Sequence, residues 1–166
     1  MKLSTNFTLA EFTNSETAKK EGYSEQFTPS DAIIQNLKFG AENIAEKIRT
    51  EFGSFAPTVA YRCERLNKKI GGSTTSMHST GQAFDETFLR NGVNISSEVF
   101  FWLVKNKDKI PFTELIWEKG DSNNPNWLHI GWKKQKEQEI LVFNGKTYFN
   151  YIGSLMHNEH IKKGLI

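Results

Sequence analysis

The first third of the chain carries a long helical stripe of apolar side chains, which limits the folds that the chain can adopt. Between Asp31 and Phe52, apolar residues recur at steps of three and four, which places them on one face of an α-helix. Pro29 and Ser30 precede this pattern and Gly53 follows it, as start and stop signals do. The sequence therefore predicts an amphipathic helix whose buried face carries Ile34, Leu37, Ala41, Ile44, Ile48 and Phe52.

Strand patterns are concentrated in the second half of the chain. Two apolar runs, 114–118 and 127–132, flank a polar loop, and two more flank Asn144-Gly145, a strong hairpin signal because both turn positions favour φ > 0. Helices first and strands later predict an α+β fold, with helices packed on a small, mainly antiparallel sheet. The other expected elements are a short helix opened by a capping box at Thr8–Glu11, strands over 57–61 and 82–88, a helix over 64–70, and a helix capped by Ser96-Ser97-Glu98.

Length and composition narrow the class of protein. We expect one domain over residues 1–166, with a metal-site core at about 57–132 and a C-terminal hairpin and tail at 138–166. The net charge of +2, without a basic run, argues against nucleic acid as a partner, and no apolar run is long enough to span a bilayer. The N-terminus has no apolar stretch of signal-peptide length, so we expect synthesis in the cytoplasm. We also expect the protein to be a monomer. The single cysteine, Cys63, excludes an internal disulfide.

Two short segments carry residues that suit a metal. In the first, His78 lies at a turn that contains Gly81, and Asp85 follows on an expected strand. In the second, His129 alternates with Leu128 and Ile130, so its side chain points to the opposite face of a strand from theirs. Two His and one Asp match the three protein ligands that are typical of a catalytic zinc site, although each residue alone would more often be structural.

A second pair of histidines, His157 and His160, lies near the C-terminus at helical spacing. No third ligand lies nearby in the sequence, and a solvated helix face is the better interpretation. Cys63 adjoins Arg62 but has no evident base, so we do not expect a nucleophile there.

The two segments that suit a metal belong to a longer ordered motif. Its residues are Tyr61-Arg62, Asn67, Gly71-Gly72, Ser76-x-His78-x-x-Gly81-x-Ala83-x-Asp85 and Trp127-Leu128-His129. This motif resembles that of the zinc D-alanyl-D-alanine carboxypeptidase family, which includes the vancomycin-resistance dipeptidases and phage L-alanyl-D-glutamate endolysins, and the resemblance covers roughly Phe7 to Trp132. It implies the fold of that family and a zinc metallopeptidase that cleaves an amide bond in peptidoglycan stem peptides. It also implies action on the cell wall, for example as a phage lysis or virion-associated protein.

The resemblance also implies roles for single residues. His78, Asp85 and His129 would be the zinc ligands, although manganese or iron also suits such a set. Arg62 would polarise or anchor the substrate near the scissile carbonyl, with a surface ion pair as its alternative. Ser76 would be a hydroxyl that lines the site, with a turn cap as its alternative.

The sequence departs from the motif of that family at Asn126, three residues before His129, where better-known members often carry Asp or Glu. An amide cannot accept a proton at neutral pH, so another carboxylate must act as the general base if the domain is an enzyme. We expect Glu118, at the end of the strand over 114–118, to be this base, and Asp121 in the polar loop is the weaker candidate. The second interpretation is a non-catalytic cell-wall-binding or structural domain that keeps the fold.

Overall fold

The computed structural model describes residues 1–134 and 137–166, which form two compact units, Met1–Asp85 and Glu86–Ile166. Helices dominate the first unit and a mainly antiparallel sheet dominates the second, so the predicted α+β class is confirmed. The expectation of one domain over residues 1–166 stays a prediction. No helix in the described residues is both long enough and apolar enough to cross a membrane.

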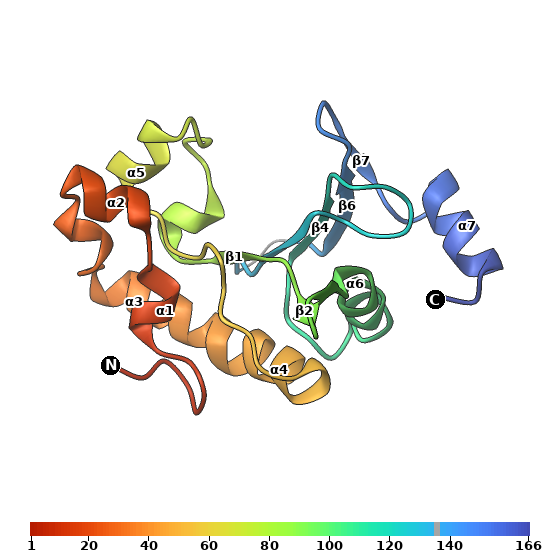
Figure 1. Cartoon of the computed structure of the whole chain (residues 1–166), viewed down its shortest axis with the longest axis horizontal. Helices are drawn as coiled ribbons and strands as arrows, with labels where there is room; N and C mark the ends of the chain where they lie inside the picture. Colours follow the sequence, from red (N-terminus) through yellow and green to blue (C-terminus); the bar gives the residue numbers. More distant parts are fainter. Residues whose placement is uncertain (135–136) are drawn as a thin grey trace. The chain divides into compact units, whose positions relative to one another are not determined.

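The first unit consists of short helices around one long helical segment, coloured from red to yellow-green in Figure 1. The capping box at its start is confirmed, since the Thr8 side chain accepts from the Glu11 N–H and the Glu11 carboxylate accepts from the Thr8 N–H. The elements are α1 (Leu9–Thr13), α2 (Glu16–Glu21), η1 (Ser24–Gln26), α3 (Asp31–Gly40), η2 (Ala41–Ala45), α4 (Glu46–Phe52), α5 (Glu64–Lys69), η3 (Met77–Thr80) and β1 (Ala83–Glu86), whose last residue opens the second unit.

The long helical segment follows the apolar stripe of the sequence. It runs through α3, the π-helical turn η2 and α4 without a break, and it ends at Gly53, which has a φ of 94°. The side chains at the centre of the stripe are completely buried, which confirms the predicted face there, whereas Ile34 and Phe52 at its two ends are half-buried. The completely buried residues of the stripe are Leu37, Ala41, Ile44 and Ile48.

The strand predicted over 57–61 is wrong. This segment makes only an isolated antiparallel bridge, between Val59 and Asp85. The ladder stops because Pro57 has no N–H and because the N–H of Tyr61 donates to the carbonyl of Phe12 at 2.9 Å.

The second unit is built on strands β5, β4, β6 and β7, which lie side by side in that order. Neighbours are antiparallel except for β4 and β6, which are parallel. Helix α6 supplies Phe100, whose ring meets Trp117 of β4 edge to face with 5.2 Å between centroids. The elements are β2 (Leu89–Arg90), β3 (Val93–Asn94), α6 (Ser96–Lys105), β4 (Glu114–Glu118), β5 (Trp127–Gly131), β6 (Glu139–Phe143), β7 (Tyr148–Asn150) and α7 (Leu155–Lys162).

Two turn and cap details in this unit differ from expectation. Ser96 is inside α6 rather than its cap, and the amides of Ser96 and Ser97 donate to the side-chain oxygens of Asn94 and Asn124. In the β6–β7 hairpin only Gly145 takes a positive φ. The predicted hairpin itself is confirmed.

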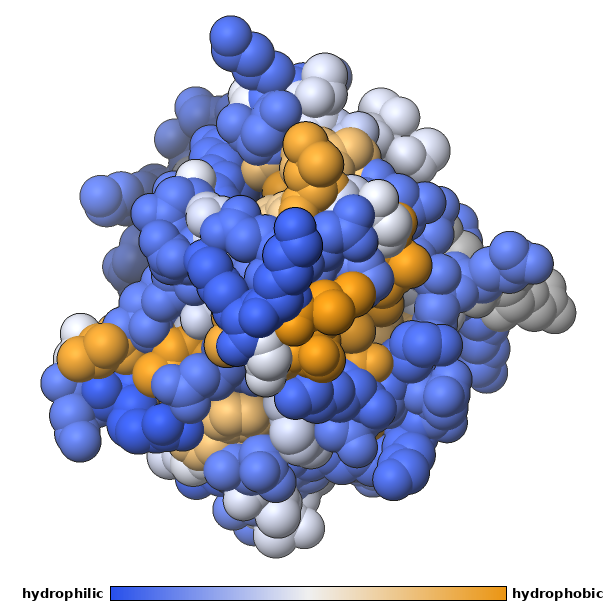
Figure 2. All heavy atoms as spheres, turned by 90° about the vertical axis from the view of Figure 1, so that its right-hand side faces the viewer, coloured by the Kyte–Doolittle hydropathy of each residue, from blue (hydrophilic) through white to orange (hydrophobic). Residues whose placement is uncertain are grey.

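The prediction of a solvated helix face is wrong for His160. The side chain is completely buried, its Nδ1 lies 2.9 Å from the Tyr151 hydroxyl, and its Nε2 lies 2.7 Å from the Ser122 carbonyl oxygen. Both ring nitrogens therefore have partners, which ties α7 to the loop between β4 and β5. Figure 2 views the molecule from the right-hand side of Figure 1 and shows several hydrophobic side chains on this face. The exposed hydrophobic residues of the second unit include Tyr148, Ile152, Leu155 and Ile161.

Candidate metal centre

His78 is held in η3 with one ring nitrogen already occupied. Its Nδ1 lies 2.7 Å from the carbonyl oxygen of Ala60, and only 2% of the residue is exposed. The helical turn ends at Gly81, which has the predicted positive φ of 67°. A side chain at Gly81 would also collide with Ile33, so only glycine fits there. The backbone contact at Nδ1 leaves Nε2 as the nitrogen of His78 that can bind a metal.

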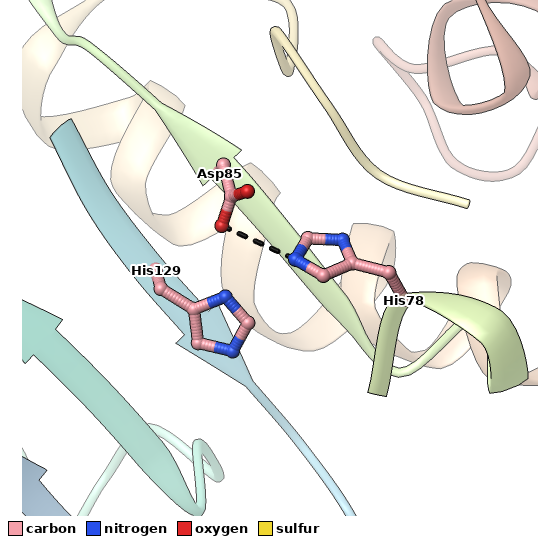
Figure 3. Close-up of side chains that lie close together, drawn as sticks. All are labelled: His78, Asp85 and His129. Carbon is pink, nitrogen blue, oxygen red and sulfur yellow. Dashed lines mark ion pairs between the residues drawn. The ribbon is translucent and has the colours of Figure 1, made fainter. Parts of the chain in front are cut away.

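Asp85 is placed on β1 by its bridge to Val59, in which the Asp85 N–H donates to the Val59 carbonyl. Its Oδ1 lies 3.2 Å from Nε2 of His78, as the dashed line in Figure 3 marks. Its Oδ2 lies 3.8 Å from a terminal nitrogen of Arg62. The carboxylate therefore lies between the histidine and the guanidinium, and one oxygen faces each of them.

Arg62 lies at this carboxylate and is not a freely solvated surface residue. Only 15% of its side chain is exposed, and its Nε is buried without a hydrogen-bond partner among the residues that the structure describes. Burial lowers the pKa of the guanidinium, and the nearby Asp85 opposes this shift, so Arg62 remains a cation at neutral pH. An unpaired donor next to the candidate ligands is suited to a substrate oxygen.

Ser76 lies directly before η3 and shapes this turn through its backbone. Its N–H donates to the carbonyl of Ser73, and its own carbonyl accepts from the N–H of Ser79, both at 3.1 Å. Asn67 also supports the turn, because its side-chain amide donates to the Ser73 carbonyl at 2.8 Å. A contact between the Ser76 hydroxyl and substrate stays a prediction.

His129 lies at the centre of β5, opposite Ile116 of β4. Leu128 and Ile130 are completely buried on the other face, as the alternation in the sequence predicts. Nε2 of His129 lies 3.4 Å from Oε1 of Glu114, so the other ring nitrogen, Nδ1, is the candidate ligand atom of this residue.

His78, Asp85 and His129 form a group of three potential metal ligands whose ligand atoms lie within 4.8 Å of one another. Zinc binds imidazole nitrogen or carboxylate oxygen at about 2.1 Å, so neighbouring ligand atoms in a tetrahedral site are about 3.4 Å apart. The 3.2 Å between His78 Nε2 and Asp85 Oδ1 agrees with this separation. Two imidazoles and one carboxylate at this spacing suit zinc, and a zinc ion held by three protein ligands has a fourth position for water or substrate.

Comparison with protein families matches residues 5–101 to the family described as Peptidase M15. This match covers more than half of the 166 residues. The chain belongs to the peptidase M15 family. No curated protein matches the chain.

The matched residues include only part of the candidate M15 site. Arg62, His78 and Asp85 lie inside the match, whereas Glu118 and His129 lie beyond it. M15 peptidases are typically zinc-dependent, and the His-Asp-His group suits that metal. The family match therefore supports metallopeptidase chemistry without identifying the bond that is cleaved.

Glu118, the expected general base, ends β4 and is 8% exposed. In the register of β4 and β5, Ile116 pairs with His129, so Glu118 lies two residues away on the same face of the sheet as His129. Asn126 is exposed, and its N–H donates to the backbone carbonyl of Glu118 at 3.0 Å. Asp121 is exposed and accepts the N–H groups of Asn123 and Asn124, which lower its pKa, so its carboxylate shapes the loop.

Two residues near the candidate ligands were not found by sequence reasoning. Glu114 contacts the ring of His129, and its strand position on the same face as Glu118 was the available signal. Gln26 is completely buried and bonds to the backbone on both sides of Arg62. No local pattern marks Gln26, because its partners lie far away in the sequence.

Proposed function

We propose that the chain is a zinc-dependent hydrolase that cleaves an amide bond in the stem peptides of peptidoglycan. The observation that supports this most is the convergence of His78, Asp85 and His129 in a chain of the M15 family. Three ligands with nitrogen and oxygen donors and an open position are what a hydrolytic zinc site requires. Zinc is the proposed metal.

The proposed chemistry divides among four groups of the chain. A bound zinc would supply Lewis-acid activation of water and of the scissile carbonyl. Glu118 would accept the proton of the attacking water and pass it to the leaving amine. Arg62 would donate to the carbonyl oxygen as negative charge develops there, either from its terminal nitrogens or from Nε, which has no partner among the described residues. Ser76 would contribute a hydroxyl to the substrate side of the site.

The substrate class and the biological setting rest on the resemblance of the motif. Carboxypeptidase-like cleavage at D-Ala-D-Ala and endopeptidase-like cleavage at L-Ala-D-Glu are both compatible with a three-ligand zinc site. The proposed place of action is the cell wall, with phage lysis or a virion-associated role as the setting. We propose that the protein acts as a monomer and without nucleic acid.

A second candidate function is a non-catalytic domain that binds the cell wall and retains the fold. The observation that favours it is Asn126, an amide where better-known relatives carry a carboxylate. In that case Glu118 would be a buried strand-end carboxylate without a catalytic role.

Digestion of purified peptidoglycan by the intact protein separates the two functions. The proposal predicts soluble peptides of defined mass, loss of this release on treatment with a chelator, and its return on addition of zinc. Zinc-loaded, folded protein that binds the wall but releases no peptide would establish the non-catalytic function instead.

A further inference from the structure

Gln26 is completely buried, and its side chain bonds to the backbone on both sides of Arg62, the residue proposed to contact the substrate. The Nε2 group of Gln26 donates to the carbonyl of Tyr61 at 2.8 Å and to the carbonyl of Thr13 at 2.9 Å. Its Oε1 accepts the N–H of Cys63 at 2.8 Å. Both amide hydrogens and the carbonyl oxygen of Gln26 are therefore used, and two of these bonds hold the residues on either side of Arg62.

The segment that Gln26 holds also supports His78. The carbonyl of Ala60 contacts Nδ1 of His78 at 2.7 Å, and the N–H of Arg62 donates to the His78 carbonyl at 3.1 Å. A displacement of residues 60–63 would consequently move Arg62 and rotate the ring of His78 together. Shifts of this kind matter because catalytic and metal-binding groups tolerate little misplacement.

The side chain of Arg62 depends on this backbone support. Its contact with Asp85 is 3.8 Å long, and its Nε has no hydrogen-bond partner within the described part of the chain. These contacts fix the guanidinium only loosely. The position of the Arg62 side chain therefore depends on the backbone of residues 61–63, which Gln26 holds in place.

We infer that Gln26 is a positioning residue that sets Arg62 and His78 by clamping the segment 60–63. This inference rests on the proposed function, in which Arg62 contacts substrate and His78 binds zinc. It requires an amide at position 26, because the site needs two donors and one acceptor in a volume that excludes water. A carboxylate would keep the acceptor toward Cys63 but would place an oxygen against the carbonyls of Tyr61 and Thr13.

The test compares Gln26→Glu and Gln26→Met with a matched control, Glu46→Ala. The Glu46 carboxylate also makes three hydrogen bonds in the first unit, to Ser4 and Asn6, but contacts nothing in the segment 60–63 among the bonds described. Zinc affinity is measured on the full chain by competition with a chromophoric chelator. Both Gln26 variants should bind zinc about 10-fold more weakly, as for loss of a group that orients a ligand, and Glu46→Ala should not.

A double-mutant cycle with Arg62→Lys then identifies the route of the effect on hydrolysis of peptidoglycan peptides. The cycle is measured at saturating zinc, so that weaker metal binding through His78 does not contribute. Each Gln26 variant should then lower kcat/KM by roughly 10-fold in the wild-type background and by much less in Arg62→Lys, because residues that act through one another are not additive. The inference is overturned if the Gln26 substitutions lower kcat/KM by the same factor in the wild-type and the Arg62→Lys backgrounds. It is also overturned if they lower zinc affinity no more than Glu46→Ala does.

Hydrogen exchange on the wild-type protein keeps the inference testable if the variants do not fold or if the wall is not the substrate. The Cys63 amide should exchange as slowly as that of Ile48 in the core of α4. If the Cys63 amide exchanges at the rate of an exposed loop amide, Gln26 does not hold the segment 60–63 and the inference is wrong. This measurement and the zinc affinity do not require hydrolysis, so they distinguish failure of the clamp from failure of the proposed function.

Discussion

Glu114 and Glu118 lie on β4 at equal distances either side of Ile116, the residue opposite His129, and we predict different consequences of removing their charges. The perturbations are Glu114→Gln and Glu118→Gln, which preserve size and remove one negative charge each. A strand rises about 3.4 Å per residue, so each glutamate starts about 7 Å along β4 from Ile116. Both side chains are long enough to reach toward the imidazole diagonally.

The expected magnitudes follow from what each carboxylate contacts. Glu114 lies 3.4 Å from Nε2 of His129 and orients the ring, so Glu114→Gln should weaken zinc binding about 10- to 100-fold, as is typical for a group that supports a ligand. Glu118, the proposed base, should leave zinc affinity nearly unchanged on conversion to Gln. Its loss should lower turnover by about 10²- to 10⁴-fold, the usual contribution of general acid–base catalysis.

The assay measures zinc affinity by chelator competition and turnover on peptidoglycan peptides at saturating zinc, with circular dichroism to confirm the fold. Full turnover of Glu118→Gln would refute its role as base, and equal zinc loss in both variants would refute the division of roles. Asn126→Asp provides a further check. If the wild type is inert and Asn126→Asp creates cleavage, then Asn126 marks a lost catalytic acid and the binding-domain function is correct.

Three further predictions concern the substrate contact, the substrate class and stability. Arg62→Lys keeps the charge but loses the planar guanidinium, so activity should fall roughly 10²-fold while zinc stays bound, and full activity would leave only the ion pair with Asp85. The protein should release peptides from peptidoglycan but not from casein fragments, and robust casein cleavage without wall activity would reverse the substrate class. His160→Ala removes two buried hydrogen bonds and a packed ring, so the free energy of unfolding in urea should fall by roughly 2–4 kcal/mol, and a loss as small as that of His157→Ala would contradict this.

The local part of the fold could be predicted because its signals are local. The periodic stripe from Ile34 to Phe52 and the capping box at Thr8 each depend on residues within one or two helical turns. The strand at 57–61 was predicted wrongly because its apolar composition does not reveal that Tyr61 and Cys63 bond to Phe12 and Gln26 instead of to a neighbouring strand.

The candidate site could be predicted only in the part that a compact motif carries. His78, Gly81 and Asp85 lie within eight residues, so the turn that joins them could be inferred from the glycine. Contacts across long separations were missed. Gln26 reaches Tyr61 across 35 residues, and His160 reaches Ser122 across 38, so neither the clamp nor the burial of His160 has a local signature.

Metal analysis of purified protein tests whether His78, Asp85 and His129 hold one zinc ion. We expect about one zinc per chain in the wild type, because these three ligands form a single group within the described part of the chain and three such ligands bind one ion. Each of His78→Ala, Asp85→Ala and His129→Ala should retain zinc much more weakly, while His157→Ala should retain the wild-type amount. Unchanged zinc content in all three ligand variants would show that these residues do not bind the metal.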